Sequence, residues 1–219
     1  MNIIDLSFSV DSETPTCGTW WHEKVEYNRL GTIDKVGRNT HKIVVGSHTA
    51  THIDAPFHFI ENGATIDEVS LETLCGDISI VDLSYLKDGD SVKISDLKDK
   101  RISKRVLFIF NWHRKWKTDS YYKNYPYFQV DTAEFLIQKG VKLIAMDTPS
   151  PDSGAAIYEQ VKDDSIIHKV FFKSNVTLIE YLSNTDKIDY TKNYIIFALP
   201  LKLKGLDGSP ARVILVDKE

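Results

Sequence analysis

The sequence has few of the features that mark specialised classes of protein. It contains only two cysteines, Cys17 and Cys75, too few to build a disulfide scaffold for 219 residues. No apolar run approaches the roughly 20 residues that span a bilayer. The first residues also lack the basic start and long apolar stretch of a signal peptide. These absences predict a cytoplasmic protein that does not have a membrane as its partner.

An excess of basic residues is also missing. The chain has 27 Lys and Arg against 31 Asp and Glu, a formal net charge of −4, which argues against nucleic acid as a partner. Apolar residues make up 42% and charged residues 26%, which excludes a disordered or fibrous chain. Without repeats, low-complexity tracts or Pro/Gly/Ser-rich linkers, residues 1–219 are expected to form a single domain.

Short apolar runs rich in β-branched residues recur along the whole chain, bounded by Gly, Asp, Ser or Pro. Such runs predict strands rather than helices. They are Ile3–Phe8, Lys42–Gly46, Ile78–Leu83, Val106–Phe110, Lys142–Met146, Val176–Ile179, Tyr194–Leu199 and Arg212–Val216. The run Val106–Phe110 has no polar alternation, which indicates a central strand that is covered on both faces.

Helices are fewer. Asp131 resembles a helix N-cap, and the segment that follows it runs to Lys139, with Gly140 as a stop signal. A second helix is predicted over residues 164–173, and a short one after Ser95. Because strands outnumber helices, the sequence favours a mixed α/β fold, barrel-like or layered, over a regular βαβ array.

Histidine and aspartate crowd into the segment from residue 47 to residue 59. His48, His52 and Asp54 carry the imidazole and carboxylate groups that Zn²⁺ and Mn²⁺ take from proteins. In a straight strand the two histidines would lie roughly 13 Å apart, too far for one ion. Pro56 argues against a long helix, so we expect a tight turn or curved loop. His58, beyond Pro56, is better placed as a proton carrier than as a further ligand.

The segment from His48 to Phe59 resembles a known signature. It matches His-x-x-Thr-His-x-Asp-x-Pro-x-His-Phe of the metal-dependent cyclase-like hydrolases, which include bacterial kynurenine formamidase and isatin hydrolase. The family usually has Gly where Ala50 stands, a departure that matters if this position needs a positive φ.

The resemblance continues over most of the chain from Ile43 onward. It includes Asp147-Thr148-Pro149-Ser150, the twelve-residue spacing of His168 and Glu180, and the tail from Pro200 to Arg212. The segment from Cys17 to Asn39 departs from the family pattern.

The resemblance implies a swivelling β/β/α cyclase-like domain with a mixed, barrel-like sheet. It implies that His48, His52 and Asp54 hold one divalent ion, and that Asp54 bridges to a second held by His168 and Glu180. His58 would be the acid/base. A Glu at position 180, where isatin hydrolase-like members with one ion have Gln, favours two ions per chain, Zn or Mn. Family members usually form homodimers or larger homo-oligomers.

These features together predict metal-dependent hydrolysis of a C–N amide bond in a small, aromatic substrate such as N-formylkynurenine. A metal-bound hydroxide would attack the carbonyl, and His58 would transfer the proton. Two alternatives stay open. One is a ring-opening hydrolase of a cyclic amide such as isatin, and the other is a non-catalytic protein that binds a metal or small molecule.

Several side chains allow more than one interpretation. Trp20 and Trp21 could stack on an aromatic substrate or lie in a core or interface. The segment Asn111–Arg114 follows a central strand, where α/β folds often place site residues, but a surface loop fits equally. Cys17 could line a pocket or be a buried structural thiol. On a helical wheel, His168 falls about 130° from the centre of the apolar stripe, so it does not look like a core histidine.

Overall fold

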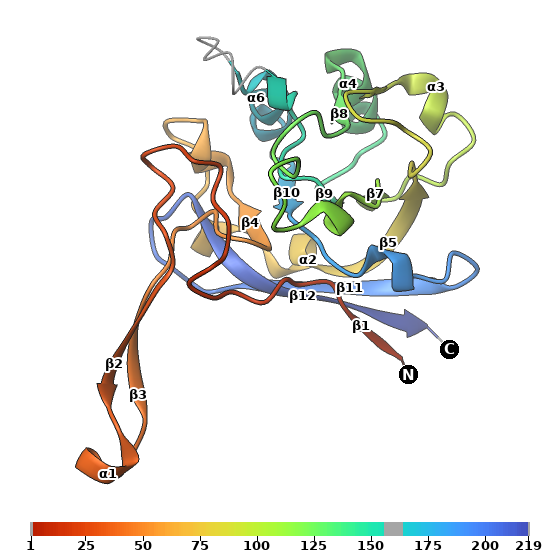
Figure 1. Cartoon of the computed structure of the whole chain (residues 1–219). Helices are drawn as coiled ribbons and strands as arrows, with labels where there is room; N and C mark the ends of the chain where they lie inside the picture. Colours follow the sequence, from red (N-terminus) through yellow and green to blue (C-terminus); the bar gives the residue numbers. More distant parts are fainter. Residues whose placement is uncertain (1, 156–163, 219) are drawn as a thin grey trace.

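The computed structural model describes residues 2–155 and 164–218, and its centre is a mixed β-sheet (Figure 1). The strands of this sheet are β1 (Ile3–Asp5), β4 (His52–Asp54), β5 (Cys75–Asp82), β7 (Arg105–Ile109), β9 (Leu143–Met146), β10 (Thr177–Glu180), β11 (Asn193–Pro200) and β12 (Gly208–Lys218). Their order is β1-β12-β11-β5-β7-β9-β10-β4, and β12 also pairs with β4. This last pairing closes all of these strands except β1 into a barrel, which confirms the predicted barrel-like α/β fold.

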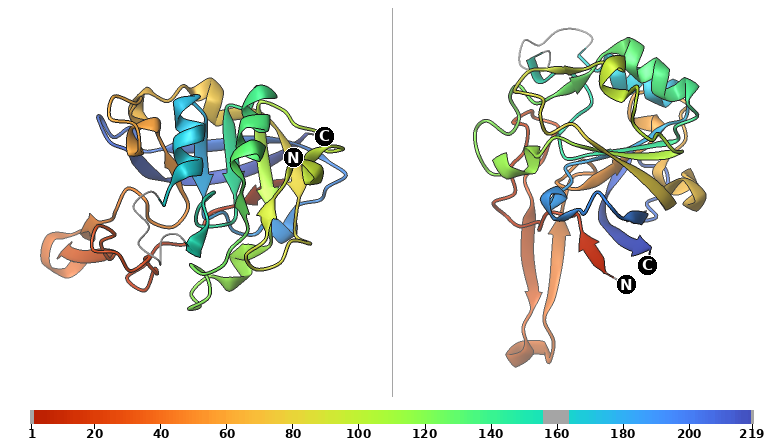
Figure 2. Two further views of the ribbon diagram at one scale, coloured as in Figure 1. Left: turned by 90° about the horizontal axis from the view of Figure 1, so that it is seen from above. Right: turned by 90° about the vertical axis from the view of Figure 1, so that its right-hand side faces the viewer.

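Strand direction divides the barrel into two parts. The pairs β5–β7, β7–β9 and β9–β10 are parallel, whereas β1, β4, β11 and β12 pair antiparallel. Helices α4 (Val130–Gln138) and α6 (Ile166–Lys173) pack together over the parallel strands (Figures 1 and 2). Among the described residues, no helix is long and apolar enough to cross a membrane.

Smaller elements connect the strands. The short helices are α2 (Leu71–Leu74), α3 (Ile94–Leu97), η1 (Pro56–His58), η2 (Ile66–Glu68), η3 (Trp112–Lys115) and η4 (Thr185–Lys187). Strands β6 (Ser91–Val92) and β8 (Tyr127–Phe128) form a separate parallel pair.

Successive side chains of the central strands point alternately into two different hydrophobic cores. Val106 and Phe108 of β7 belong to the cluster under the helices, whereas Leu107 and Ile109 point to the barrel interior. All four are fully buried. Because side chains alternate along a strand, burial on both faces requires an unbroken apolar run. The prediction for Val106–Phe110 is therefore confirmed.

The predicted strands are all present in the structure, with ends shifted by a few residues. The predicted N-cap is wrong, because α4 begins at Val130 and Gln129 is its N-cap. Asp131 instead lies in the first turn, where its carboxylate suits the positive end of the helix. Gly140 has φ +80°, as a residue that stops a helix requires.

An arm projects from the barrel (Figures 1 and 2). It consists of β2 (Glu26–Gly31) and β3 (Thr40–Val44), which pair antiparallel and are joined at the tip by α1 (Ile33–Val36). Almost every side chain of the arm is exposed. The arm includes much of the sequence from Cys17 to Asn39 that departs from the family pattern. Its first strand, β2, was not predicted.

Candidate active site

The segment from His48 to His58 folds as a turn, a short strand and a 3₁₀ turn. His48 lies in the turn after β3, β4 carries His52 and Asp54, and Pro56 begins the turn that places His58. The His48 and His52 ring centroids are 5.0 Å apart. Asp54 Oδ1 lies 2.7 Å from His48 Nδ1 and 2.9 Å from His52 Nε2. The predicted curved loop therefore brings these three side chains together.

Ala50 lies at the sharpest point of this loop. Its φ is +52°, the left-handed region that costs an L-residue roughly 1–2 kcal/mol. The loop is held there because the Thr51 hydroxyl donates to the Tyr181 carbonyl at 2.6 Å and accepts from the Phe8 N–H at 2.9 Å. This backbone angle gives a physical reason for the glycine that the family usually has here.

Replacing Ala50 by glycine should therefore cost less stability than the same change elsewhere in the motif. Ala55, equally buried but with φ −97°, is the matched control. Both variants lose a buried methyl and gain unfolded-state entropy, but only Ala50→Gly relieves strain. The free energy of unfolding, measured by urea denaturation, should fall by about 1–2 kcal/mol less for Ala50→Gly than for Ala55→Gly. Equal losses would contradict this account.

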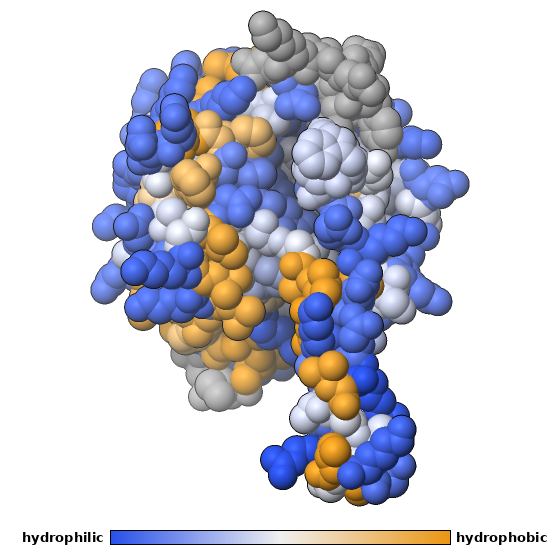
Figure 3. Space-filling model, turned by 90° about the vertical axis from the view of Figure 1, so that its left-hand side faces the viewer, coloured by the Kyte–Doolittle hydropathy of each residue, from blue (hydrophilic) through white to orange (hydrophobic). Residues whose placement is uncertain are grey.

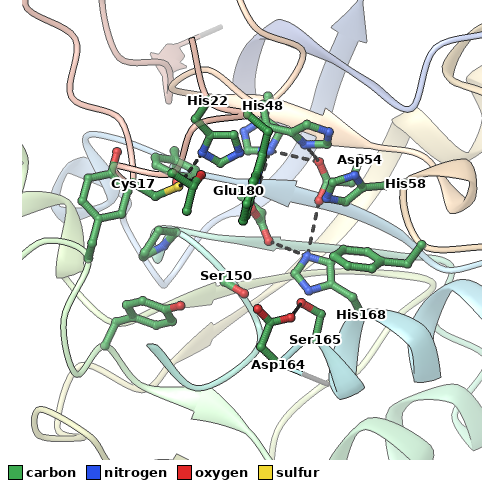
Figure 4. Close-up of a pocket in the computed structure, with 18 residues that line it drawn as sticks. Cys17, His22, His48, Asp54, His58, Ser150, Asp164, Ser165, His168 and Glu180 are labelled. Carbon is green, nitrogen blue, oxygen red and sulfur yellow. Dashed lines mark hydrogen bonds and ion pairs between the residues drawn. The ribbon is translucent and has the colours of Figure 1, made fainter. Parts of the chain in front are cut away.

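Glu180 and His168 reach the same place from two other elements, the neighbouring strand β10 and helix α6. Glu180 ends β10 and is the register partner of His52, whereas His168 comes from α6. His168 Nε2 lies 3.2 Å from Glu180 Oε1 and 3.5 Å from Asp54 Oδ2. These predicted residues thus converge on Asp54 (Figure 4).

His168 is buried, which the helical wheel did not indicate. Although His168 lies off the apolar stripe of α6, it is buried because it packs against acidic side chains. Its Nδ1 lies 2.6 Å from Asp152 Oδ2, and the Asp152 carboxylate also accepts the Ile167 and His168 backbone N–H groups. Asp152, which the sequence analysis missed, therefore orients His168 and supports the start of α6.

Two carboxylate oxygens at the centre of the site lack hydrogen-bond donors. Asp54 Oδ2 and Glu180 Oε1 are buried and accept no hydrogen bond, although His168 Nε2 is near both. A buried carboxylate oxygen that accepts no hydrogen bond is costly, unless a cation binds it. These oxygens are thus suited to a divalent metal ion.

The electrostatics of the cluster also favour a cation. Burial disfavours a charged His48, but the Asp54 and Asp207 carboxylates outweigh it and raise the pKa of His48 to about 10. Burial opposes charge on His168 as well, yet its hydrogen bond to Asp152, with Asp54 and Glu180, raises its pKa well above the usual value. His48 and His168 are thus surrounded by carboxylates, which are also suitable ligands for a divalent cation.

The two acids respond differently to the same surroundings. Burial alone would raise the pKa of Asp54, but His48 and His52 hold it well below its usual range. Burial and repulsion from Asp54 raise the pKa of Glu180. Asp54 is therefore the main negative charge of the cluster.

Asp54 is shared by two groups of side chains, each with ligand atoms within 4.8 Å of one another. One group is His48, Asp54 and His58, and the other is His52, Asp54 and Glu180. The resemblance had combined His48 with His52 and left His58 outside. Either division gives Asp54 a bridging position, so the exact ligand sets stay a prediction.

His58 is held between a histidine and an acid. Its ring stacks on that of His48 at 3.8 Å, and its Nδ1 lies 3.3 Å from Asp207 Oδ2. The same Asp207 oxygen lies 2.7 Å from His48 Nε2. Burial lowers the pKa of His58, which favours the neutral form that can accept a proton.

Asp207 was not singled out from the sequence, although it lies in the Gly-Leu-Asp-Gly tail. The chain must pass close to His48 here, and a Cβ on Gly208 would lie 2.9 Å from His48 Cε1. Burial would raise the pKa of Asp207, but hydrogen bonds from His48 and His58 lower it. Asp207 therefore orients both imidazoles.

The cluster lies in the wall of a cavity of about 270 Å³ (Figure 4), near the lower end of the range for small-molecule sites. Its described lining includes the aromatic residues Trp21, Phe59, Tyr122, Tyr125 and Tyr181. Trp20 is not among the described lining residues, and 86% of its surface is exposed. Of the two predicted tryptophans, only Trp21 is at the cavity.

Cys17 also lines this cavity and is only partly buried, so the structural-thiol interpretation is wrong. Its Sγ lies 2.6 Å from His22 Nδ1. Burial, with the nearby His48, lowers the pKa of His22 to about 4 and keeps it neutral.

The segment Asn111–Arg114 does not contribute to the described lining of the cavity. His113 Nδ1 instead lies 2.8 Å from Thr185 Oγ1, and the buried Asp147 accepts the N–H groups of Phe110 and Trp112. These contacts tie the loops after β7, β9 and β10 together. Pro149 and Ser150, which follow Asp147, thereby reach the cavity.

Comparison with known families agrees with this geometry. The family model named Cyclase matches residues 4–153, more than half of the chain. The chain belongs to the cyclase family. Kynurenine formamidase of Bacillus mycoides (strain KBAB4) is 30% identical over 179 residues, which cover 81% of this chain and 79% of that protein.

Solved structures show the same fold. An isatin hydrolase bound to the product analogue thioisatinate superposes with a TM-score of 0.85 at 21% identity, covering 99% of this chain and 92% of that one. A potential metal-dependent hydrolase with cyclase activity gives a TM-score of 0.75 at 26% identity, covering 100% and 98%. This cyclase-family chain is thus an enzyme of the hydrolase class, with side chains suited to a divalent metal.

Proposed function

We propose that this cyclase-family enzyme hydrolyses the C–N amide bond of a small aromatic amide such as N-formylkynurenine. The observation that carries the proposal is Asp54, a buried carboxylate on which four histidines and one glutamate converge at the wall of an aromatic cavity. The kynurenine formamidase relatives support an acyclic formamide as the substrate.

The ions would be Zn²⁺ or Mn²⁺, two per chain, held by His48, His52, Asp54, His168 and Glu180. When bound, such ions acidify a water molecule and polarise the amide carbonyl. His58 accepts the proton of the attacking water and passes it to the departing nitrogen, while Asp207 keeps its ring in place. Trp21 and Phe59 contact the aromatic ring of the substrate and exclude water.

A ring-opening hydrolase of a cyclic amide is the second candidate, supported by the shared fold with isatin hydrolase. A screen of N-formylkynurenine, formanilide and isatin, with metal content measured on the same sample, separates the candidates. We expect the formamides to be hydrolysed faster than isatin. Turnover of isatin alone would favour the second candidate. Metal without any turnover would favour a non-catalytic binding protein.

Glu180→Gln tests the second ion. The substitution removes one negative charge but keeps the shape, so metal content should fall from about two to about one per chain. The activity–pH profile should move to higher pH, because less positive charge then acts on the attacking water. His168→Ala should behave in the same way, whereas Glu134→Gln, exposed on α4, should leave both unchanged. Unaltered stoichiometry in Glu180→Gln would contradict the two-ion site.

We further propose that the enzyme is a cytoplasmic homodimer or larger homo-oligomer. Both cysteines are free, which is typical of a reducing compartment. The arm (residues 26–44) exposes apolar side chains, among them Leu30, Ile33 and Ile43 (Figure 3). An isolated two-stranded ribbon is only marginally stable in water. Basic residues outnumber acidic ones in the arm, whereas the whole chain has a net negative charge. The arm is therefore complementary in charge to the body of a second copy, against which it could pack.

The arm makes this assembly testable. Leu30→Asp combined with Ile43→Asp should convert the oligomer to monomers in sedimentation velocity, because both charges would be buried against the partner. Tyr190→Asp changes an exposed aromatic side chain on the body and should leave the mass unchanged. A wild-type protein that sediments as a monomer at micromolar concentration would refute the proposal.

A further inference from the structure

The cavity has an acid that the metal cluster does not use. Asp164 precedes α6 and lines the cavity together with Ser150 and Ser165. In Figure 4 these three residues lie on the side of His168 that faces away from His48 and Asp54. Asp164 belongs to neither group of side chains that could hold a metal.

The Asp164 carboxylate is available to a ligand. The Ser165 hydroxyl donates to its Oδ1 at 2.8 Å, and no ion pair with a cationic side chain is present among the described residues. The Ser165 hydroxyl lies beside it, and Ser150 lines the same cavity. This end of the cavity therefore offers hydrogen-bond acceptors and one negative charge.

The described lining contains no lysine or arginine. The Nζ of Lys169 lies 6.0 Å from the centroid of the Phe59 ring, but Lys169 is not itself part of that lining. A substrate carboxylate at the Asp164 end would meet a like charge, and no lysine or arginine of the described lining would compensate it.

We propose that Asp164 determines substrate specificity by binding an amine or ammonium group at the end of the substrate opposite the scissile amide. This inference rests on the proposed function and names its substrate class. The preferred substrates are aromatic amides whose side chain carries an amine or ammonium group, and those with only a carboxylate are disfavoured. Aromatic walls strengthen this discrimination, because they keep water away from the charge.

Three 2-formamidophenyl ketones would test the proposal on the metal-containing enzyme as purified. They share the ring and the formamide and differ only in the chain on the ketone, which is aminoethyl, ethyl or carboxyethyl. We expect kcat/KM to decrease in that order, with roughly tenfold or more between the aminoethyl and carboxyethyl compounds. A carboxyethyl compound hydrolysed as fast as the aminoethyl compound would overturn the proposal.

Asp164→Asn assigns the effect to this residue. The variant should lose most of the preference by raising KM for the aminoethyl compound, while kinetics with the neutral ethyl compound stay near those of the wild type. Asp88→Asn, which removes an exposed surface charge, is the matched control and should keep the preference. Equal losses for all three compounds in Asp164→Asn would show a structural role and refute the proposal.

Failure of the proposed function gives a different result. If no formamide is hydrolysed, calorimetry can measure binding of the corresponding three 2-aminophenyl ketones. Their relative affinities show the preference for charge without turnover. Tighter binding of the aminoethyl ketone that disappears in Asp164→Asn would support the role of Asp164 alone. Equal binding of all three ketones by the wild type would refute it.

Discussion

Asp54→Asn should lose most of its bound metal and more activity than any other single change at the site. Asp54 is fully buried, and its Oδ1 lies within 3 Å of a nitrogen from both His48 and His52. The substitution keeps the shape but removes the negative charge shared by both possible ligand groups. Activity should fall by more than the roughly 10–100-fold that loss of an outer hydrogen-bond partner of a metal ligand costs.

Elemental analysis of Asp54→Asn, His48→Ala and His52→Ala, measured side by side, would check this. Each histidine contacts one part of the cluster, so each alanine variant should retain more metal than Asp54→Asn. Circular dichroism spectra would confirm that all three variants fold. Equal metal losses in the three variants would indicate a site with a single ion.

His58→Ala should lower kcat by roughly 10²–10⁴-fold, as loss of a general acid/base does. Metal content should stay near that of the wild type, because His58 donates no charge to the cluster and Asp54 keeps its other partners. His113→Ala, which lies outside the described lining of the cavity, is the control and should retain activity. The ring of His58 is close enough to Asp54 to bind an ion, so loss of metal together with activity would make it a ligand.

The sequence allowed the centre of the sheet to be predicted because strands β7, β9 and β10 are buried on both faces. Strand β7 is apolar from Val106 to Ile109, a pattern typical of a strand covered on both faces. Strand β4 escaped detection because it has only three residues, two of them the polar His52 and Asp54. It is extended because β10 and β12 pair with it from both sides, which no local pattern could reveal.

The same distinction separates the predicted site residues from the missed ones. His48, His52, Asp54 and His58 lie within one segment, so their spacing alone indicated a cluster. Asp207 is 159 residues from His48, and only the closed sheet brings the two side chains to 2.7 Å. An aspartate between two glycines has no local feature that distinguishes it from a turn residue.

The place of β4 in the sheet has a thermodynamic consequence. Only three residues long, β4 is the seam at which the barrel closes, and the same residues carry the imidazole of His52 and the carboxylate of Asp54. An ion held there would bind the closed barrel and not an opened one, so each increase in its free concentration above its Kd would add to the free energy of closure. With such an ion bound, the stability of the closed barrel would depend on the supply of metal in its surroundings.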